Sequence, residues 1–235
     1  MVRGLPVTRT GLRPGPGPEI PRRPPPSLLF NDRMTSDTTA LRPAISARDL
    51  RLRRWDPLSD ADAETFLRGC LDPEFQRWNT PQRPIRDLAD ARAALESKAE
   101  AAEAGTGVAF CVEDADSGAP LGHIGVNRID RAMRSAIVGY WVLPEARGRG
   151  VATRALGVTA RWVFTDLGLY RLELDHAVGH EVSCKVAERC GFRYEGTLRG
   201  AMWQEGRRDA FRDCHLHARL ATDPEPAEAK NGSGA

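Results

Sequence analysis

The sequence predicts a mixed α/β or α+β fold, in which one sheet is flanked by helices. Strand-like segments arranged as hairpins come before a long amphipathic helix, and a β-α-β-β run follows that helix. This order favours one mixed sheet over separate all-helical and all-strand domains. The composition, with 41% hydrophobic and 28% charged residues, is typical of a globular protein.

The 235 residues divide into a central domain and two tails. Residues 1–40 hold eight of the 17 prolines, so we expect a disordered N-terminal tail, with Met34 as a candidate native start. Residues 222–235 are polar and are expected to form a second disordered tail, which leaves residues 41–221 as one domain. Residues 1–33 carry a net charge of +4 and the rest of the chain −2. An acidic domain argues against nucleic-acid binding, and no stretch approaches the ~18 apolar residues of a membrane span.

Alternating or continuous apolar patterns predict seven strands. The turn-forming run Asp116-Ser117-Gly118 separates the second strand from the third, and Pro144 closes the fourth. The expected strands cover residues 49–55, 107–114, 120–129, 135–143, 171–177, 192–199 and 208–218.

Four helices are expected between these strands. Ser59 and Asp60 are N-cap candidates for the first helix, and Gly191 follows the end of the last. The third helix presents one apolar stripe from Val151 to Trp162. The expected helices cover about residues 59–71, 87–103, 151–167 and 181–190.

The loop that leads into the third helix is rich in glycine and arginine, with the order Arg147-Gly148-Arg149-Gly150. Glycine lets backbone come close to a ligand, and the first amides of a helix have no partner within it. The helix dipole adds partial positive charge there, so this loop predicts a phosphate or pyrophosphate site, with an incidental surface turn as the alternative. The loop lacks the Gly-Lys-Ser/Thr ending of a P-loop and the G-x-G-x-x-G dinucleotide fingerprint.

Residues Arg147 to Ala152 resemble the R/Q-x-x-G-x-G/A signature of the GNAT N-acetyltransferase superfamily. Three further segments, Gly139 to Pro144, Ala187 to Phe192 and Tyr194 to Arg199, look like its RimJ/RimL-type branch of ribosomal-protein alanine N-acetyltransferases. The resemblance covers about residues 48–220. It implies a mostly antiparallel, twisted sheet of six to seven strands that is splayed at its central strands, and acetyl-CoA as the co-substrate.

The resemblance also implies where acetyl-CoA binds. The backbone of the strand segment Tyr140, Trp141 and Val142 would pair with the pantetheine arm, and an amide there would stabilise charge on the thioester oxygen. His180 stands where the branch carries an asparagine that contacts the cofactor. The pyrophosphate would be held by the loop and the helix start, namely Arg147, Gly148, Arg149, Gly150, Val151, Ala152 and Thr153.

Catalytic roles follow from the same resemblance and from residue chemistry. Ser183 would lie near the sulfur and protonate the leaving thiolate, unless its hydroxyl only bonds its own helix backbone. Glu173 and Asp175 share one strand face and are candidates for the general base, with a salt-bridged or solvated face as the alternative. No tyrosine lies in residues 181–190 to act as a phenolic acid. Trp78 lies in a loop that borders the acceptor site of relatives, so it either contacts substrate or packs.

The expected activity is direct transfer of an acetyl group to a primary amine in a ternary complex. A protein N-terminal α-amine is favoured because its pKa of roughly 7.7–8.0 leaves it partly neutral at pH 7. The alternatives are a small-molecule amine acetyltransferase and a module that binds acetyl-CoA without catalysis. Beyond the amine acceptor we expect no nucleic-acid or membrane partner, and a monomer or homodimer.

The cysteines and histidines carry weaker signals. Five cysteines without a C-x-x-C pair favour thiols in a reducing, cytoplasmic compartment. His215 and His217 share a strand face, but no cysteine or carboxylate cluster accompanies them at ligand spacing, so we expect no metal. His123 and His176 are expected to be structural.

Overall fold

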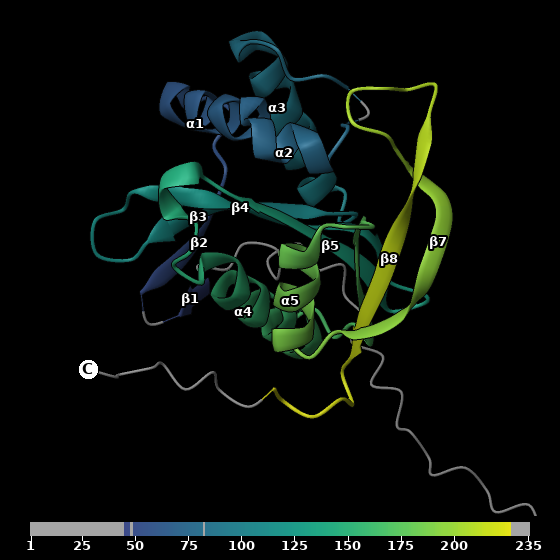
Figure 1. Ribbon diagram of the computed structural model, residues 1–235. Helices are drawn as coiled ribbons and strands as arrows, with labels where there is room; N and C mark the ends of the chain where they lie inside the picture. Colours follow the sequence, from purple (N-terminus) through teal and green to yellow (C-terminus); the bar gives the residue numbers. More distant parts are fainter. Residues whose placement is uncertain (1–44, 48, 82, 227–235) are drawn as a thin grey trace, which may run out of the picture. The chain divides into compact units, whose positions relative to one another are not determined.

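The computed structural model describes residues 45–47, 49–81 and 83–226. They form one 8-stranded sheet in the order β1-β2-β3-β4-β5-β6-β8-β7, with helices on both faces (Figure 1). All neighbouring strands pair antiparallel except β5 and β6, which are parallel. The strands are β1 (Ile45–Ala47), β2 (Leu50–Arg54), β3 (Val108–Asp114), β4 (Pro120–Asp130), β5 (Ser135–Val142), β6 (Arg171–Ala177), β7 (Arg193–Trp203) and β8 (Phe211–Leu220).

The mixed fold and the mostly antiparallel sheet are confirmed, with eight strands in place of the expected six to seven. The additional strand is β1, which pairs Ile45 with Leu52 and Ala47 with Leu50. Three residues are too few to show an alternating pattern, so only the pairing with β2 identifies this strand.

The helices are α1 (Asp60–Leu71), α2 (Pro73–Trp78), α3 (Leu88–Glu103), α4 (Val151–Thr165) and α5 (Glu181–Arg189), with a 3₁₀ turn, η2 (Pro144–Ala146). Ser59 caps α1, because its side chain accepts from the amide of Asp62. Helix α2 is absent from the expected set. The residues at its start are nevertheless typical of a helix N-terminus. Asp72 caps the helix by accepting from the Phe75 amide at 2.9 Å, and Pro73 occupies the first turn.

The helices cover the two faces of the sheet unequally. Helices α1, α2 and α3 lie on one face, and α4 and α5 lie on the other (Figure 1). The larger core, on the α4 and α5 side, includes Phe110, Leu156 and Val186. The smaller core, between the sheet and the α1–α3 layer, includes Trp55, Phe66 of α1 and Leu95 of α3.

Helix α1 approaches the sheet closely at one glycine. A Cβ built on Gly69 would lie 2.3 Å from Cη2 of Trp141, a distance that no real contact allows. The Trp141 indole also forms an edge contact with Phe66, with ring centroids 6.0 Å apart. Gly69 therefore permits the contact between α1 and β5 that holds this indole in the smaller core.

Strands β5 and β6 part after three residue pairs. Ser135, Ala136 and Ile137 pair with Arg171, Leu172 and Glu173. Beyond these pairs β5 stays bonded to β4 as far as Val142, and β6 stays bonded to β8 as far as Ala177. The expected splay of the central strands is confirmed, and it opens toward the first turns of α4 and α5 (Figure 1).

The described residues make contacts beyond residue 221, and the domain end expected there stays a prediction. Asp223 accepts from the Leu220 amide at 2.9 Å, and Glu225 pairs with the buried Arg219 at 3.1 Å. The expected disorder of residues 1–40 and the remainder of the C-terminal tail, 227–235, lies outside the described residues. None of the helices that the structure describes has the length and apolar character of a membrane span.

Candidate active site

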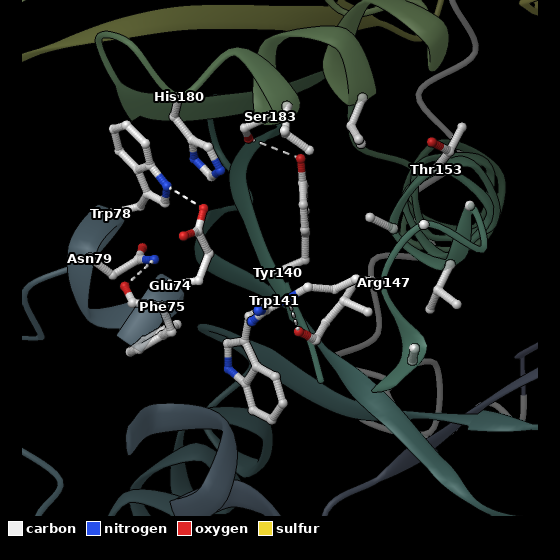
Figure 2. A pocket seen from close by; sticks show the side chains of 18 of the residues that line it. Glu74, Phe75, Trp78, Asn79, Tyr140, Trp141, Arg147, Thr153, His180 and Ser183 are labelled. Carbon is white, nitrogen blue, oxygen red and sulfur yellow. Dashed lines mark hydrogen bonds between the residues drawn. The ribbon is translucent and has the colours of Figure 1, made fainter. Parts of the chain in front are cut away.

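A cavity of about 510 Å³ lies beside β5, beyond its last pairing with β6 (Figure 2). Four segments of the chain line it: α2, the end of β5, the loop into α4 with the first turn of that helix, and α5. The cavity brings together most of the residues that the sequence singled out. These are Trp78, Tyr140, Trp141, Val142, Arg147, Gly148, Gly150, Val151, Ala152, Thr153, His180 and Ser183.

One end of the cavity is the first turn of α4. Gly150 precedes the helix with φ +70° and Gly148 has φ +74°, a left-handed region that favours glycine. No side chain of the described residues caps α4, so the amides of its first turn point outward without a protein partner. The positive end of the helix dipole lies at these amides, which is the geometry that the loop sequence predicts for an anion site, and anion binding there stays a prediction.

The two arginines of this loop differ in their placement. Arg147 lines the cavity, donates from Nε to the Val142 carbonyl at 3.2 Å and pairs with Asp72. Arg149 is exposed and does not line the cavity, and its carbonyl accepts from Arg154 at 2.7 Å. The structure therefore gives Arg149 a place in the loop backbone, and its contact with a cofactor stays a prediction.

A pair of hydroxyl groups lies in the middle of the cavity. The Tyr140 phenol and the Ser183 hydroxyl are 2.9 Å apart and hydrogen-bonded, and both side chains point inward (Figure 2). Burial raises the pKa of Tyr140 well above its usual value, so the phenol stays protonated at neutral pH. The sequence showed no tyrosine on α5, and the structure brings this phenol from β5.

The other end of the cavity holds an indole, an imidazole and a carboxylate. The His180 ring stacks on Trp78 with centroids 4.6 Å apart and planes inclined by 3°. The Trp78 Nε1 donates to Glu74 Oε1 at 2.7 Å (Figure 2). Burial, assisted by the nearby His176, lowers the pKa of His180 to about 4, so its imidazole is neutral at pH 7. Sequence reasoning missed Glu74, because it lies on α2.

Glu173 and Asp175, the two expected candidates for the base, do not line this cavity. Glu173 accepts from the Arg171 guanidinium at 2.7 Å, which is the salt-bridged alternative for that side chain. Burial raises the pKa of Asp175. The catalytic role of either carboxylate stays a prediction.

Comparisons with known proteins identify the family. Residues 49–193 match the model of the acetyltransferase (GNAT) domain. The ribosomal-protein-serine acetyltransferase of Escherichia coli (strain K12) is 33% identical over 100 residues, 43% of this chain and 54% of the relative. The spermidine N(1)-acetyltransferase of the same strain is 30% identical over 122 residues, 51% of this chain and 64% of the relative. The chain thus spans less than two thirds of the length of either relative.

Solved structures agree with the fold. Mycobacterium smegmatis RimJ in complex with a CoA disulfide superposes with a TM-score of 0.64 at 26% identity, over 73% of this chain and 82% of that one. RimL, a ribosomal L7/L12 α-N-protein acetyltransferase solved with coenzyme A, gives a TM-score of 0.66 at 18% identity, over 76% and 97%. With more than half of the sequence matched and the splayed sheet in place, the chain belongs to the GNAT acetyltransferase family.

Proposed function

We propose that this chain is an N-acetyltransferase that moves the acetyl group of acetyl-CoA to a primary amine, with a protein N-terminal α-amine as the acceptor. One observation carries the proposal. A single cavity joins the outward amides of α4 to the hydrogen-bonded pair of Tyr140 and Ser183. The amides can bind an anion and the hydroxyl pair can donate a proton. This arrangement suits an acetyl donor that carries phosphate at one end and a leaving thiolate at the other.

The residues present fit coenzyme A. The pyrophosphate would accept from the amides that follow Gly150, where the positive helix end offsets its charge. The edge of β5 that has no β6 partner beyond Ile137 would offer backbone groups to the pantetheine amides. Both contacts use backbone atoms, so they depend on the local conformation more than on side-chain identity.

In the transfer step the amine nitrogen attacks the thioester carbon, so that a C–N bond forms and the C–S bond breaks. Ser183 would protonate the departing thiolate and regain a proton from Tyr140, which burial keeps protonated until then. Tyr140 would in turn regain its proton from solvent. Glu74 would take the amine proton, directly or through water, because its carboxylate lines the cavity, where it accepts from Trp78 Nε1. Asp175 and Glu173 are the second candidates for this role.

The acceptor is proposed from amine chemistry and from the relatives. An α-amine is partly neutral at pH 7, so it depends less on a general base to remove its proton than a lysine side chain does. Relatives named for ribosomal proteins support a protein N-terminus, and a relative named for spermidine makes a polyamine the second candidate. The carboxylate of Glu74 suits either cationic group. All five cysteines are free thiols, which supports the cytoplasm as the proposed location.

A thiol-release assay with acetyl-CoA tests the proposal. The acceptors are short peptides with free N-termini, the same peptides with blocked N-termini, and spermidine. We expect release with the free peptides and little with the blocked ones. Release with spermidine alone would move the assignment to the polyamine. Binding of coenzyme A by calorimetry without release from any amine would leave a non-catalytic module, and absence of binding would remove the function altogether.

A further inference from the structure

Three histidines and a cysteine meet on the sheet face beneath α5, outside the cavity described above. His176 comes from β6, His215 and His217 come from β8, and Cys184 comes from α5. One potential ligand atom from each lies within 4.8 Å of the other three. None of the four side chains lines the proposed active site.

The topology explains how these residues meet. β6 and β8 run antiparallel with His176 opposite His215, and His217 lies two residues further along on the same face. α5 begins four residues after β6 ends and runs across this face, which places Cys184 over the histidines. The expectation of no metal rested on the lack of a cysteine or carboxylate cluster at ligand spacing from His215 and His217 in the chain. The fold supplies a cysteine from a different element.

His176 already has the form of a metal ligand. Its Nδ1 lies 3.0 Å from the Ala177 carbonyl, which can only accept, so Nδ1 carries the proton. Nε2 is then an unprotonated lone-pair donor, and it is buried without a hydrogen-bond partner among the described residues. The residue is 5% exposed. Imidazole ligands of metals usually donate their second nitrogen to a carbonyl in this way.

Cys184 and His217 are already spaced as ligands of one ion. Cys184 Sγ lies 3.6 Å from His217 Nε2. With Zn–S near 2.3 Å and Zn–N near 2.0–2.1 Å, two corners of a tetrahedron are about 3.6 Å apart. The widest separation in the cluster exceeds this edge by about 1 Å. Rotation of His215, which is only half-buried, would close that difference.

We propose that His176, Cys184, His215 and His217 form a tetrahedral Zn²⁺ site that fastens α5 to β6 and β8. Three imidazoles and a thiolate are donors that zinc prefers and that Mg²⁺ and Ca²⁺ do not. Four protein ligands close the coordination sphere, as in structural zinc sites. On binding, the Zn–S bond forms, the Cys184 S–H bond breaks and the proton goes to solvent. The site does not depend on acetyl transfer, although it lies one residue from Ser183.

The test uses the full chain, stripped of metal with a chelator and titrated with Zn²⁺ or Co²⁺. We expect one ion per chain, with thiolate-to-cobalt charge transfer in the near ultraviolet and the visible bands of tetrahedral Co²⁺. Cys184→Ala should abolish the charge-transfer band. Cys184→Ala and His215→Gln should each weaken Zn²⁺ binding by at least about 100-fold. Loss of a residue that only hydrogen-bonds to a ligand already costs about 10–100-fold in metal affinity. Cys70→Ala, at a buried cysteine on α1, is the matched control and should bind as the wild type does.

Thermal unfolding provides a second measurement that does not depend on the Co²⁺ spectrum. The wild-type Tm should rise with free Zn²⁺ because the four ligands meet only in the folded chain, and the Tm of the two cluster variants should not. The proposal is overturned if the wild type binds no Zn²⁺. It is also overturned if Cys184→Ala binds as tightly as Cys70→Ala, since the ion would then lie elsewhere.

Discussion

The hydrogen-bonded hydroxyls of Tyr140 and Ser183 are the two side chains to which the proposed proton transfer is assigned. They are 43 residues apart in the chain and lie on different elements. From the sequence Ser183 could be placed through its helix position, but the partner of its hydroxyl could not. A hydrogen bond between a strand and a helix depends on tertiary topology, and neither residue carries a local signal for it.

Removal of these hydroxyls should slow acetyl transfer much more than it weakens donor binding. For Ser183→Ala we expect kcat to fall by about 100-fold or more, the usual contribution of a general acid, with little change in coenzyme A affinity. Tyr140→Phe should slow the same step. The double variant should be about as slow as the slower single variant, because the two groups act as one unit. Steady-state kinetics and calorimetry measure these effects.

Tyr170→Phe, at an exposed tyrosine outside the cavity, is the control and should keep wild-type kcat. An equal loss of kcat and of donor affinity in Ser183→Ala would withdraw the acid role from Ser183. Additive losses in the double variant would mean that the two hydroxyls act separately.

Among the secondary-structure elements, those with a strong period or a clear cap were predictable. Helix α4 begins at Val151 as expected, because a glycine loop precedes its apolar stripe, and α3 begins directly after its Asp87 cap. Helix α2 and strand β1 are too short to show a period. The same difference applies to the residues that line the cavity. Its α4 side could be predicted from the loop, whereas its α2 side, with Glu74, could not.

Substitution of two helix glycines by alanine distinguishes the effect of close packing on stability from the effect of helix propensity. Gly69→Ala should lower the free energy of unfolding by about 1–3 kcal/mol, because the added Cβ would overlap the Trp141 indole. Gly157→Ala, within α4, meets nothing within 4 Å and should raise that free energy by about 0.5–1 kcal/mol. Urea unfolding of both variants measures the difference. A neutral or stabilised Gly69→Ala would show that α1 and β5 are packed less closely than described.

At the scale of the whole domain, a partly buried network of ion pairs connects α1 to strands β2 and β3. Arg53 of β2 donates to Asp62 of α1 at 2.7 and 2.8 Å and to Glu113 of β3 at 2.6 Å. Glu113 also accepts from Arg51 at 2.7 Å. Burial alone would raise the pKa of Asp62, but hydrogen bonds from Arg53 and from the Asp56 amide outweigh it and the pKa is lowered. The network therefore links stability to pH.

The stability that Asp62 contributes should disappear in acid. A carboxyl whose pKa is lower folded than unfolded stabilises the fold above the unfolded pKa, near 3.9, and loses this effect as pH falls through the folded pKa. Asp62→Asn should therefore be clearly less stable than the wild type at neutral pH, and the difference should shrink below about pH 4. Urea unfolding across this range measures it.

Asp116→Asn, at an exposed turn, is the comparison and should differ little from the wild type at any of these pH values. A difference between Asp62→Asn and the wild type that stays constant down to the lowest pH would contradict the linkage.

The short seam between β5 and β6 also has a mechanical consequence. In the described structure, β5 and β6 join β1–β5 to β6–β8 through three residue pairs. We expect the two halves of the sheet to move relative to one another about that line. An acetyl donor whose amides hydrogen-bond to both β5 and β6 would take the place of the missing strand pairing between them. Hydrogen exchange at residues 138–142 and 174–177 would then slow together when coenzyme A binds, and the substrate would complete the sheet that receives it.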